Sequence, residues 1–141
     1  IEALFVEPTD EHRREHTLSP QDIIVGIHLP PVPDGGNSAY LKAMDRKVWA
    51  FALVGAAVSV NVEGGQIRDA VVVLNGVAPT PWRAREAEAV LLGQAPSEEL
   101  FAQAAEAALA GAHPQAQNGY KVPLAKTLIR RALQQAVAGS E

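Results

Sequence analysis

The chain has 141 residues, of which 48% are apolar and 20% are charged, with no cysteine and a formal net charge of −4. This is the composition of one ordinary globular domain, whose core needs no disulfide or metal. The lack of cysteine excludes a thiolate zinc site or an iron–sulfur cluster bound by this segment. Because the basic residues are scattered and no apolar run reaches the ~20 residues of a membrane span, neither nucleic acid nor membrane is expected as a partner.

The first half of the chain is predicted to form an antiparallel sheet. The polar, proline-bounded stretch PTDEHRREHTLSP, residues 8–20, is expected to be an exposed loop or a one-turn helix, so 1–20 is expected to precede the ordered part of the domain as a loop or linker. Residues 23–29 (IIVGIHL) are rich in β-branched side chains and stop at two prolines, so they are predicted to be a strand. Further strands, the last two joined by the glycine turn EGGQ, are predicted at 38–44, 50–62 and 67–78. The sheet of three to four strands is therefore expected to span 21–79.

The second half of the chain has the periodicity of helices. Thr80 and Pro81 suit the start of a helix that ends at Gly93. Ser97 is the expected N-cap of a second helix, whose apolar stripe is Phe101, Ala104, Ala105, Ala108 and Leu109. A last helix is expected, with Arg130 and Arg131 largely on its exposed face. Its buried face is expected to comprise Leu124, Leu128, Ala132 and Val137. Three helices over 80–141, packed on one face of the preceding sheet, predict an α+β fold.

None of the motifs GxSxG, HExxH and GxGxxG, nor a Walker loop, occurs in the sequence, so no catalytic residue is predicted. His12 and His16 are spaced like two metal ligands on a helix, but no third ligand is near, so no metal site is predicted. Lys42 lies in a strand-like segment and must reach solvent, pair with an acid such as Asp45, or meet an anionic ligand; solvent is favoured. The neighbouring cations and aromatic residues are typical of flavin sites and equally of domain interfaces.

A resemblance to a known family is carried by segments that follow one another in a fixed order. They are LFVEPTD, DIIVGIHLP, AYLKAMDRKVWAFALVGAAVSV, GGQIRDAVVVLNGVAPTPWRAREAEAVLLG and VPLAKTLIRRAL. Over nearly its whole length the chain resembles the C-terminal domain of the FAD-binding (medium) subunit of molybdenum hydroxylases, the xanthine dehydrogenase and carbon monoxide dehydrogenase flavoprotein family. Tyr120 and Lys121, followed by VPLAK, are more similar to the aldehyde oxidoreductase branch. We therefore expect 1–141 to be a single C-terminal domain, cut from a longer subunit, with 1–20 as the linker from a FAD-binding domain.

The resemblance implies a part in a multi-subunit oxidoreductase. In such enzymes a molybdenum cofactor in a large subunit oxidises the substrate. Iron–sulfur clusters of the 2Fe–2S type in a small subunit pass electrons to FAD in the medium subunit, which delivers them to an acceptor. This domain would help to hold FAD, which is bound mostly by the N-terminal domain, and would not be catalytic alone. The implied partners are that N-terminal FAD-binding domain, the iron–sulfur subunit and the molybdenum subunit, in the cytoplasm or alternatively the periplasm.

Two residues are implied to contact the flavin. Lys42 matches the lysine of the family's (F/L)-K-x-x-x-R segment, which Arg46 closes, and would place a cation near the flavin ring. Ile24, six residues before Pro30, matches an apolar residue that lies against the flavin in the family. The alternative is a stand-alone α+β protein–protein interaction module without a redox role. A surface with no apolar patch around Lys42, Trp49 and Phe51 would favour that alternative.

Overall fold

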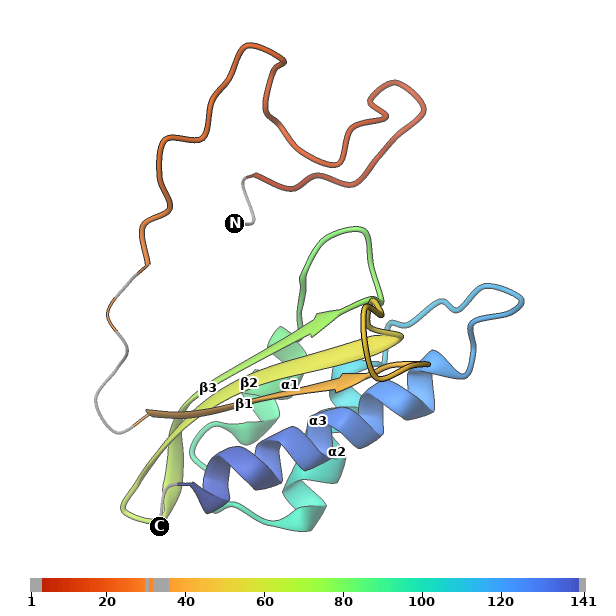
Figure 1. The fold of residues 1–141 in the computed structure, drawn as a ribbon. Coiled ribbons are helices and arrows are strands. Elements are labelled where there is room, and N and C mark those ends of the chain that lie inside the picture. The colour runs from red at the N-terminus through yellow and green to blue at the C-terminus, as the bar shows by residue number, and fades with distance from the viewer. Residues whose placement is uncertain (1–3, 30, 32–35, 140–141) are drawn as a thin grey trace.

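The computed structural model describes residues 4–29, 31 and 36–139. The chain forms an antiparallel sheet and then three helices. The strands lie in the order β1 (Gly36–Ala43), β2 (Val54–Glu63), β3 (Gln66–Asn75) and β4 (Trp82–Arg83). They are accompanied by α1 (Arg85–Leu91), α2 (Glu98–Ala108) and α3 (Lys121–Ala138). All three helices lie on one side of the sheet, so the predicted α+β fold is confirmed (Figure 1).

The β2–β3 hairpin closes with the two-residue turn that the sequence predicts. Gly64 and Gly65 have φ angles of 60° and 77°, and Glu63 pairs directly with Gln66. Such a turn requires positive φ at both central positions, which glycine adopts without steric cost. The turn therefore fixes the pairing next to it, and an irregularity between Asn61 and Val62 shifts the register by one residue along the rest of the two strands.

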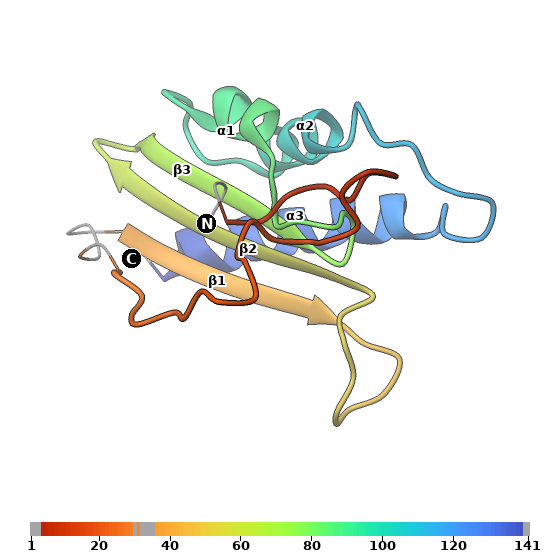
Figure 2. The same cartoon turned by 90° about the horizontal axis from the view of Figure 1, so that it is seen from above.

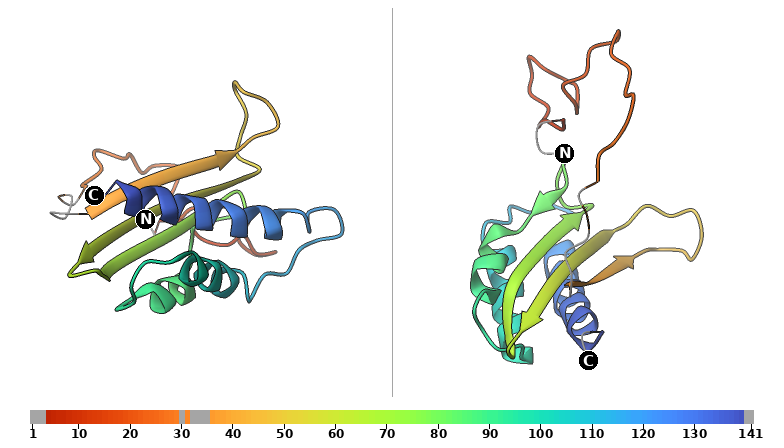
Figure 3. Two further views of the ribbon diagram at one scale, coloured as in Figure 1. Left: turned by 90° about the horizontal axis from the view of Figure 1, so that it is seen from below. Right: turned by 90° about the vertical axis from the view of Figure 1, so that its left-hand side faces the viewer.

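Side chains alternate between two faces of the sheet. The face under the helices is buried, and its principal residues are Ala39, Val54, Ala56, Val58, Val60, Ala70, Val72 and Leu74. Helix α3 packs across β1 and β2, while α1 packs on β3 and α2 lies between the other two helices (Figures 2 and 3). The core is this one layer between sheet and helices, which leaves the opposite face of the sheet free of helices.

The helices follow the predicted pattern closely. The Ser97 hydroxyl caps α2 by accepting the N–H of Leu100 at 3.1 Å. The predicted stripe of α2 is buried at Phe101, Ala104, Ala105 and Ala108. On α3, Arg130 and Arg131 are exposed as predicted. Among the described residues, no helix is both long enough and apolar enough to cross a bilayer.

The start of α1 differs from the prediction. Trp82 and Arg83 form β4 and pair with Leu74 and Val73, and the helix begins at Arg85 rather than after Thr80. The N–H of Ala84 then donates to the carbonyl of Val72 at 2.8 Å. The edge of β3 offers these backbone groups hydrogen-bond partners, and this tertiary contact outweighs the local preference for a helix start.

The strand predicted at 23–29 is not formed. None of the described residues of 4–29 is buried, and this part of the chain runs apart from the sheet and helices (Figure 1). It contains an isolated bridge between Phe5 and His16 and a turn at Ser19. A strand needs a neighbouring strand to satisfy its backbone groups, and the described residues supply none for 23–29. The sheet therefore starts at β1.

Candidate functional site

The open face of the sheet carries a small polar group of side chains beside Lys42. In register, Lys42 on β1 lies opposite Gly55 on β2, which lies opposite Asn75 on β3. A Cβ atom placed on Gly55 would come within 1.8 Å of Asn75 Oδ1 and 2.9 Å of the Tyr40 hydroxyl. The side chains of Tyr40 and Asn75 therefore close over Gly55, and glycine is the residue that leaves them room. We call Tyr40, Lys42, Gly55 and Asn75 the open-face cluster.

Lys42 is exposed, as its strand position predicts, and it also has a definite partner. Its ammonium donates to the carbonyl of Ala50 at 3.1 Å. Of the three alternatives that the sequence left open, solvent exposure is the one observed, together with a backbone bond that the sequence did not suggest. An ammonium has three N–H donors, so this bond leaves donors that can serve a ligand.

The loop between β1 and β2 presents apolar side chains beside the open-face cluster. Trp49 and Phe51 are 91% and 98% exposed, and Val48 is also exposed. Trp49 has a φ of 55°, in the left-handed region that a bulky residue rarely occupies. Arg46 donates to the carbonyl of Trp49 at 2.6 Å, next to the carbonyl that Lys42 binds. The two cations of the family segment thus hold the strained backbone of this loop, whose apolar side chains are exposed.

The base of the same loop rests on a glycine and a second lysine. Gly76 has a φ of 74°, and a Cβ there would lie 3.0 Å from the carbonyl oxygen of Ala52. Lys121, at the start of α3, donates to the carbonyl of Gly76 at 2.6 Å. The N–H of Leu53 donates to the carbonyl of Ala43 at 2.9 Å. These contacts fix both ends of the loop, so its apolar tip is presented from a defined base.

The other residues singled out from the sequence lie apart from this cluster. Ile24 is 60% exposed and belongs to the N-terminal segment, which the structure does not bring to Lys42 (Figure 1). His12 and His16 are exposed. Within 4–29, 31 and 36–139, no group of three or more histidine, aspartate or glutamate side chains could hold a metal ion.

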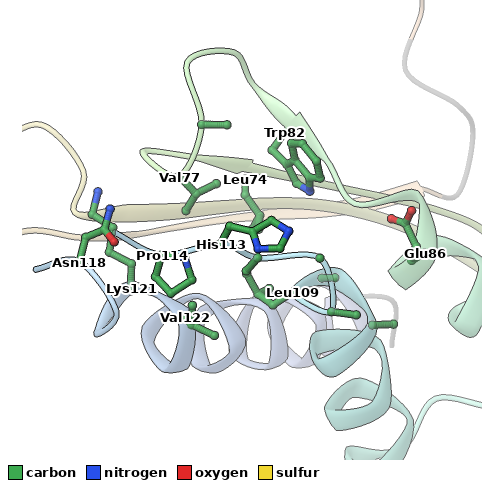
Figure 4. A pocket seen from close by; sticks show the side chains of 16 residues that line it. Leu74, Val77, Trp82, Glu86, Leu109, His113, Pro114, Asn118, Lys121 and Val122 are labelled. Carbon is green, nitrogen blue, oxygen red and sulfur yellow. The ribbon is translucent and has the colours of Figure 1, made fainter. Parts of the chain in front are cut away.

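A pocket of about 290 Å³ lies on the helix side of the sheet (Figure 4). Its lining is mainly apolar and includes Leu74, Val77, Trp82, Leu109, His113 and Val122. Sequence reasoning missed this pocket, because its walls come from β3, β4, the end of α2 and the start of α3. The single residues that line it carry no sequence motif.

These features define a two-layer α+β module that offers a cation and an exposed aromatic loop on the open side of its sheet. Residues 39–136 match the model of the CO dehydrogenase flavoprotein C-terminal domain, and the chain belongs to this family. The residues that carried the resemblance in the sequence therefore identified the family correctly.

Relatives of known name share this domain within longer chains. The chain is 40% identical over 126 residues to the aldehyde oxidoreductase FAD-binding subunit PaoB of Escherichia coli K12, covering 88% of this chain and 36% of that protein. It is 33% identical over 126 residues to the carbon monoxide dehydrogenase medium chain of Afipia carboxidovorans, covering 86% and 43%. The chain thus spans well under half of the length of these curated relatives.

Solved structures show the same fold. Carbon monoxide dehydrogenase from Hydrogenophaga pseudoflava superposes with a TM-score of 0.72 at 37% identity, over 78% of this chain and 39% of that chain. Quinoline 2-oxidoreductase from Pseudomonas putida 86 superposes with a TM-score of 0.71 at 28% identity, over 78% and 39%.

Proposed function

We propose that this chain is the C-terminal domain of the FAD-binding subunit of a molybdenum-dependent hydroxylase, where it helps to hold the FAD that carries electrons from iron–sulfur clusters to an acceptor. The proposal rests mainly on the position of Lys42. It is exposed on the open face of the sheet, held by the carbonyl of Ala50, in a chain that belongs to the flavoprotein family. The exposed Trp49 and Phe51 lie on the loop that Lys42 fixes.

The whole enzyme that we propose is an oxidoreductase with several subunits. One relative is named as an FAD-binding subunit, and one similar structure is named as the cyanide-inactivated form of a Cu,Mo-CO dehydrogenase. By analogy, we assign the molybdenum cofactor and the 2Fe–2S clusters to partner subunits, and most FAD contacts to an N-terminal domain of the same subunit. Identity of 40% to PaoB, against 33% to a carbon monoxide dehydrogenase medium chain, supports the aldehyde oxidoreductase branch. The cytoplasmic location stays a prediction.

The residues of the open face fit one side of a flavin ring. Lys42 and Tyr40 offer N–H and O–H donors, and Trp49 and Phe51 offer apolar surface that would exclude water. The sequence has no glycine-rich loop that could bind the pyrophosphate of FAD, so we assign that part of the cofactor to the N-terminal domain. This domain would therefore close a flavin site that is formed mainly by the N-terminal domain.

FAD supplies an isoalloxazine ring that accepts and releases electrons. This chain would supply a fixed positive charge and a hydrogen bond from Lys42 beside that ring. Hydrogen bonds to charged groups contribute about 1.5–3 kcal/mol, so the Lys42 ammonium favours whichever form of the ring carries more negative charge. The bond from Lys42 to Ala50 keeps the ammonium in place, which lowers the cost of ordering this flexible side chain.

The experiment compares variants of the full FAD-binding subunit, produced with its partner subunits. We expect Lys42→Ala to lower the FAD content or to slow substrate-dependent flavin reduction, while Lys42→Arg retains more of both. Lys47→Ala is the matched control, because Lys47 is an exposed lysine in the loop that follows β1. If Lys42→Ala binds and reduces FAD like the wild type, then Lys42 only fixes the loop, and the site assignment is wrong.

The alternative interaction module uses the same exposed aromatic residues without a cofactor. Trp49 and Phe51 would then contact a partner protein, and Lys42 would only support the loop. The flavin content of the purified full subunit distinguishes the two hypotheses, because an interaction module would contain no flavin at any stage of purification.

A further inference from the structure

The pocket on the helix side of the sheet has no part in the proposed function. It measures about 290 Å³, and its mainly apolar lining comes from β3, β4, the end of α2 and the start of α3 (Figure 4). It lies behind the open-face cluster, because Leu74 lines the pocket and its neighbour Asn75 belongs to the cluster on the other face. A cavity of roughly 150 Å³ already holds a benzene ring, so this pocket has room for a ring with a short side chain.

The walls of the pocket are held in place by the fold. Leu74 and Ala108 belong to the buried core. The Lys121 ammonium donates to the carbonyl of Gly76 at 2.6 Å, which ties the start of α3 to the loop after β3. Because the walls are already ordered, a ligand would lose little affinity to ordering of the protein, as in most small-molecule sites.

The apolar part of the lining suits a flat, apolar body. Val77, Leu109 and Val122 are only half-buried. Trp82 pairs with Leu74 across β4 and β3, so the two side chains point to the same side of the sheet, and 43% of Trp82 remains exposed. A bound ring would remove this apolar surface from water, which favours binding.

One end of the pocket suits a positive charge. Figure 4 shows the Glu86 carboxylate at the same end of the pocket as the Trp82 ring. The lining also includes the end of α2, which is the negative end of the helix dipole, and no basic residue lies in the last turn of α2. A cation beside a carboxylate and a tryptophan ring is attracted by both. Lys121 lies at the opposite end, next to Asn118, so its charge is kept away from this position.

We propose that this pocket binds a small arylalkylamine, a ligand with an aromatic ring and a protonated primary amine. The ring lies against Leu74, Leu109 and Val122, and the ammonium lies between Trp82 and Glu86. The proposal is independent of the flavin function, because the pocket and the open-face cluster occupy opposite faces of the sheet.

The test is isothermal titration calorimetry of the full FAD-binding subunit with three probes of similar size: phenethylamine, phenethyl alcohol and phenylacetate. At about pH 8 the amine is protonated, as a lysine side chain is. We expect phenethylamine to bind at one site with a Kd below about 1 mM. It should bind about tenfold more tightly than the neutral alcohol, because only the amine gains the carboxylate and tryptophan contacts. The anionic phenylacetate should bind more weakly than either.

Two variants locate the site. Glu86→Gln removes the negative charge at an exposed position and should bring the affinity for the amine close to that for the alcohol. Ala110→Phe places a ring in the lining, also at an exposed position, and should abolish binding of both probes. Glu99→Gln is the matched control, because Glu99 is an exposed glutamate of α2 outside the lining. Thermal unfolding of each variant checks that it remains folded.

The outcomes test the pocket separately from the flavin function. No saturable heat with phenethylamine would overturn the proposal, and so would equal affinities for the amine and the alcohol. Binding that is unchanged in both Glu86→Gln and Ala110→Phe would place the amine elsewhere and would also overturn it. Amine binding that depends on Glu86 in a subunit without FAD would support the pocket and reject the proposed function.

Discussion

The carboxylate of Glu88 accepts a hydrogen bond from the backbone N–H of Val72 at 3.0 Å, so a side chain on α1 completes the edge of β3. The same carboxylate accepts from Arg83 Nε at 2.9 Å. After Arg83 the chain leaves β4 and turns into the helix, so no strand can provide an acceptor for Val72. Glu88 is only 7% exposed and joins α1, β3 and β4 at one point.

Replacement of Glu88 should therefore destabilise the domain. We expect Glu88→Ala to lower the free energy of unfolding by about 1–3 kcal/mol, because the buried N–H of Val72 loses its acceptor. Glu88→Gln retains an acceptor oxygen and should cost less. Urea unfolding of the chain measures the effect, with Glu86→Ala as control, since Glu86 is an exposed glutamate on the same helix. Equal effects at the two positions would contradict the role given to Glu88.

Gly55→Ala tests the open-face cluster. The added Cβ would displace the side chains of Asn75 and Tyr40, whose end atoms lie 1.8 Å and 2.9 Å from it. Since these are mobile side-chain ends and alanine suits a strand better than glycine, we expect stability to change by no more than about 1 kcal/mol. The FAD content of the full subunit should fall, and Gly55→Ala/Asn75→Ala should restore part of it. Gly111→Ala is the control, because a Cβ there meets nothing within 4 Å.

Trp49 provides a test of backbone strain. Its φ of 55° lies in the left-handed region. This conformation raises the free energy of a residue that has a Cβ by about 1–2 kcal/mol, whereas glycine adopts it without this penalty. We therefore expect Trp49→Gly to be at least as stable as Trp49→Ala in thermal unfolding, although glycine usually destabilises a folded chain. A clearly higher melting temperature for Trp49→Ala would show that this loop does not hold the left-handed conformation.

Ser97→Ala should weaken α2. The substitution removes the acceptor for the N–H of Leu100, and loss of an N-cap typically costs about 1 kcal/mol. For a domain of this size, that corresponds to a decrease of about 3 °C in melting temperature. Ser97→Asp keeps a capping oxygen and should melt near the wild type. An unchanged melting temperature for Ser97→Ala would mean that the cap contributes nothing measurable.

The features that could be predicted from the sequence are those set by neighbouring residues. The Gly64–Gly65 turn, the Ser97 cap and the exposed position of Lys42 each depend on a few adjacent positions, and the structure contains all three. The strand at Trp82 and Arg83 could not be predicted in this way, because it exists only where the edge of β3 is available.

Only part of the candidate site could be predicted from the sequence. Lys42 was found through the family segment, whereas the contact of Asn75 and Tyr40 above Gly55 arises from three strands in one register. The left-handed backbone of Trp49 depends on carbonyl bonds from Lys42 and Arg46, which no pattern of residue types reveals. Ile24 remains a prediction, because it lies in the exposed N-terminal segment, which runs apart from the sheet (Figure 1).

The central claim is that this chain closes a flavin site in a longer subunit, and the flavin-to-protein ratio of that subunit tests it most directly. The ratio is measured by visible absorbance of the flavin released when the purified full-length subunit is denatured. We expect equimolar amounts of FAD and subunit. A folded full-length subunit that contains no FAD, and takes up none when FAD is added, would contradict it.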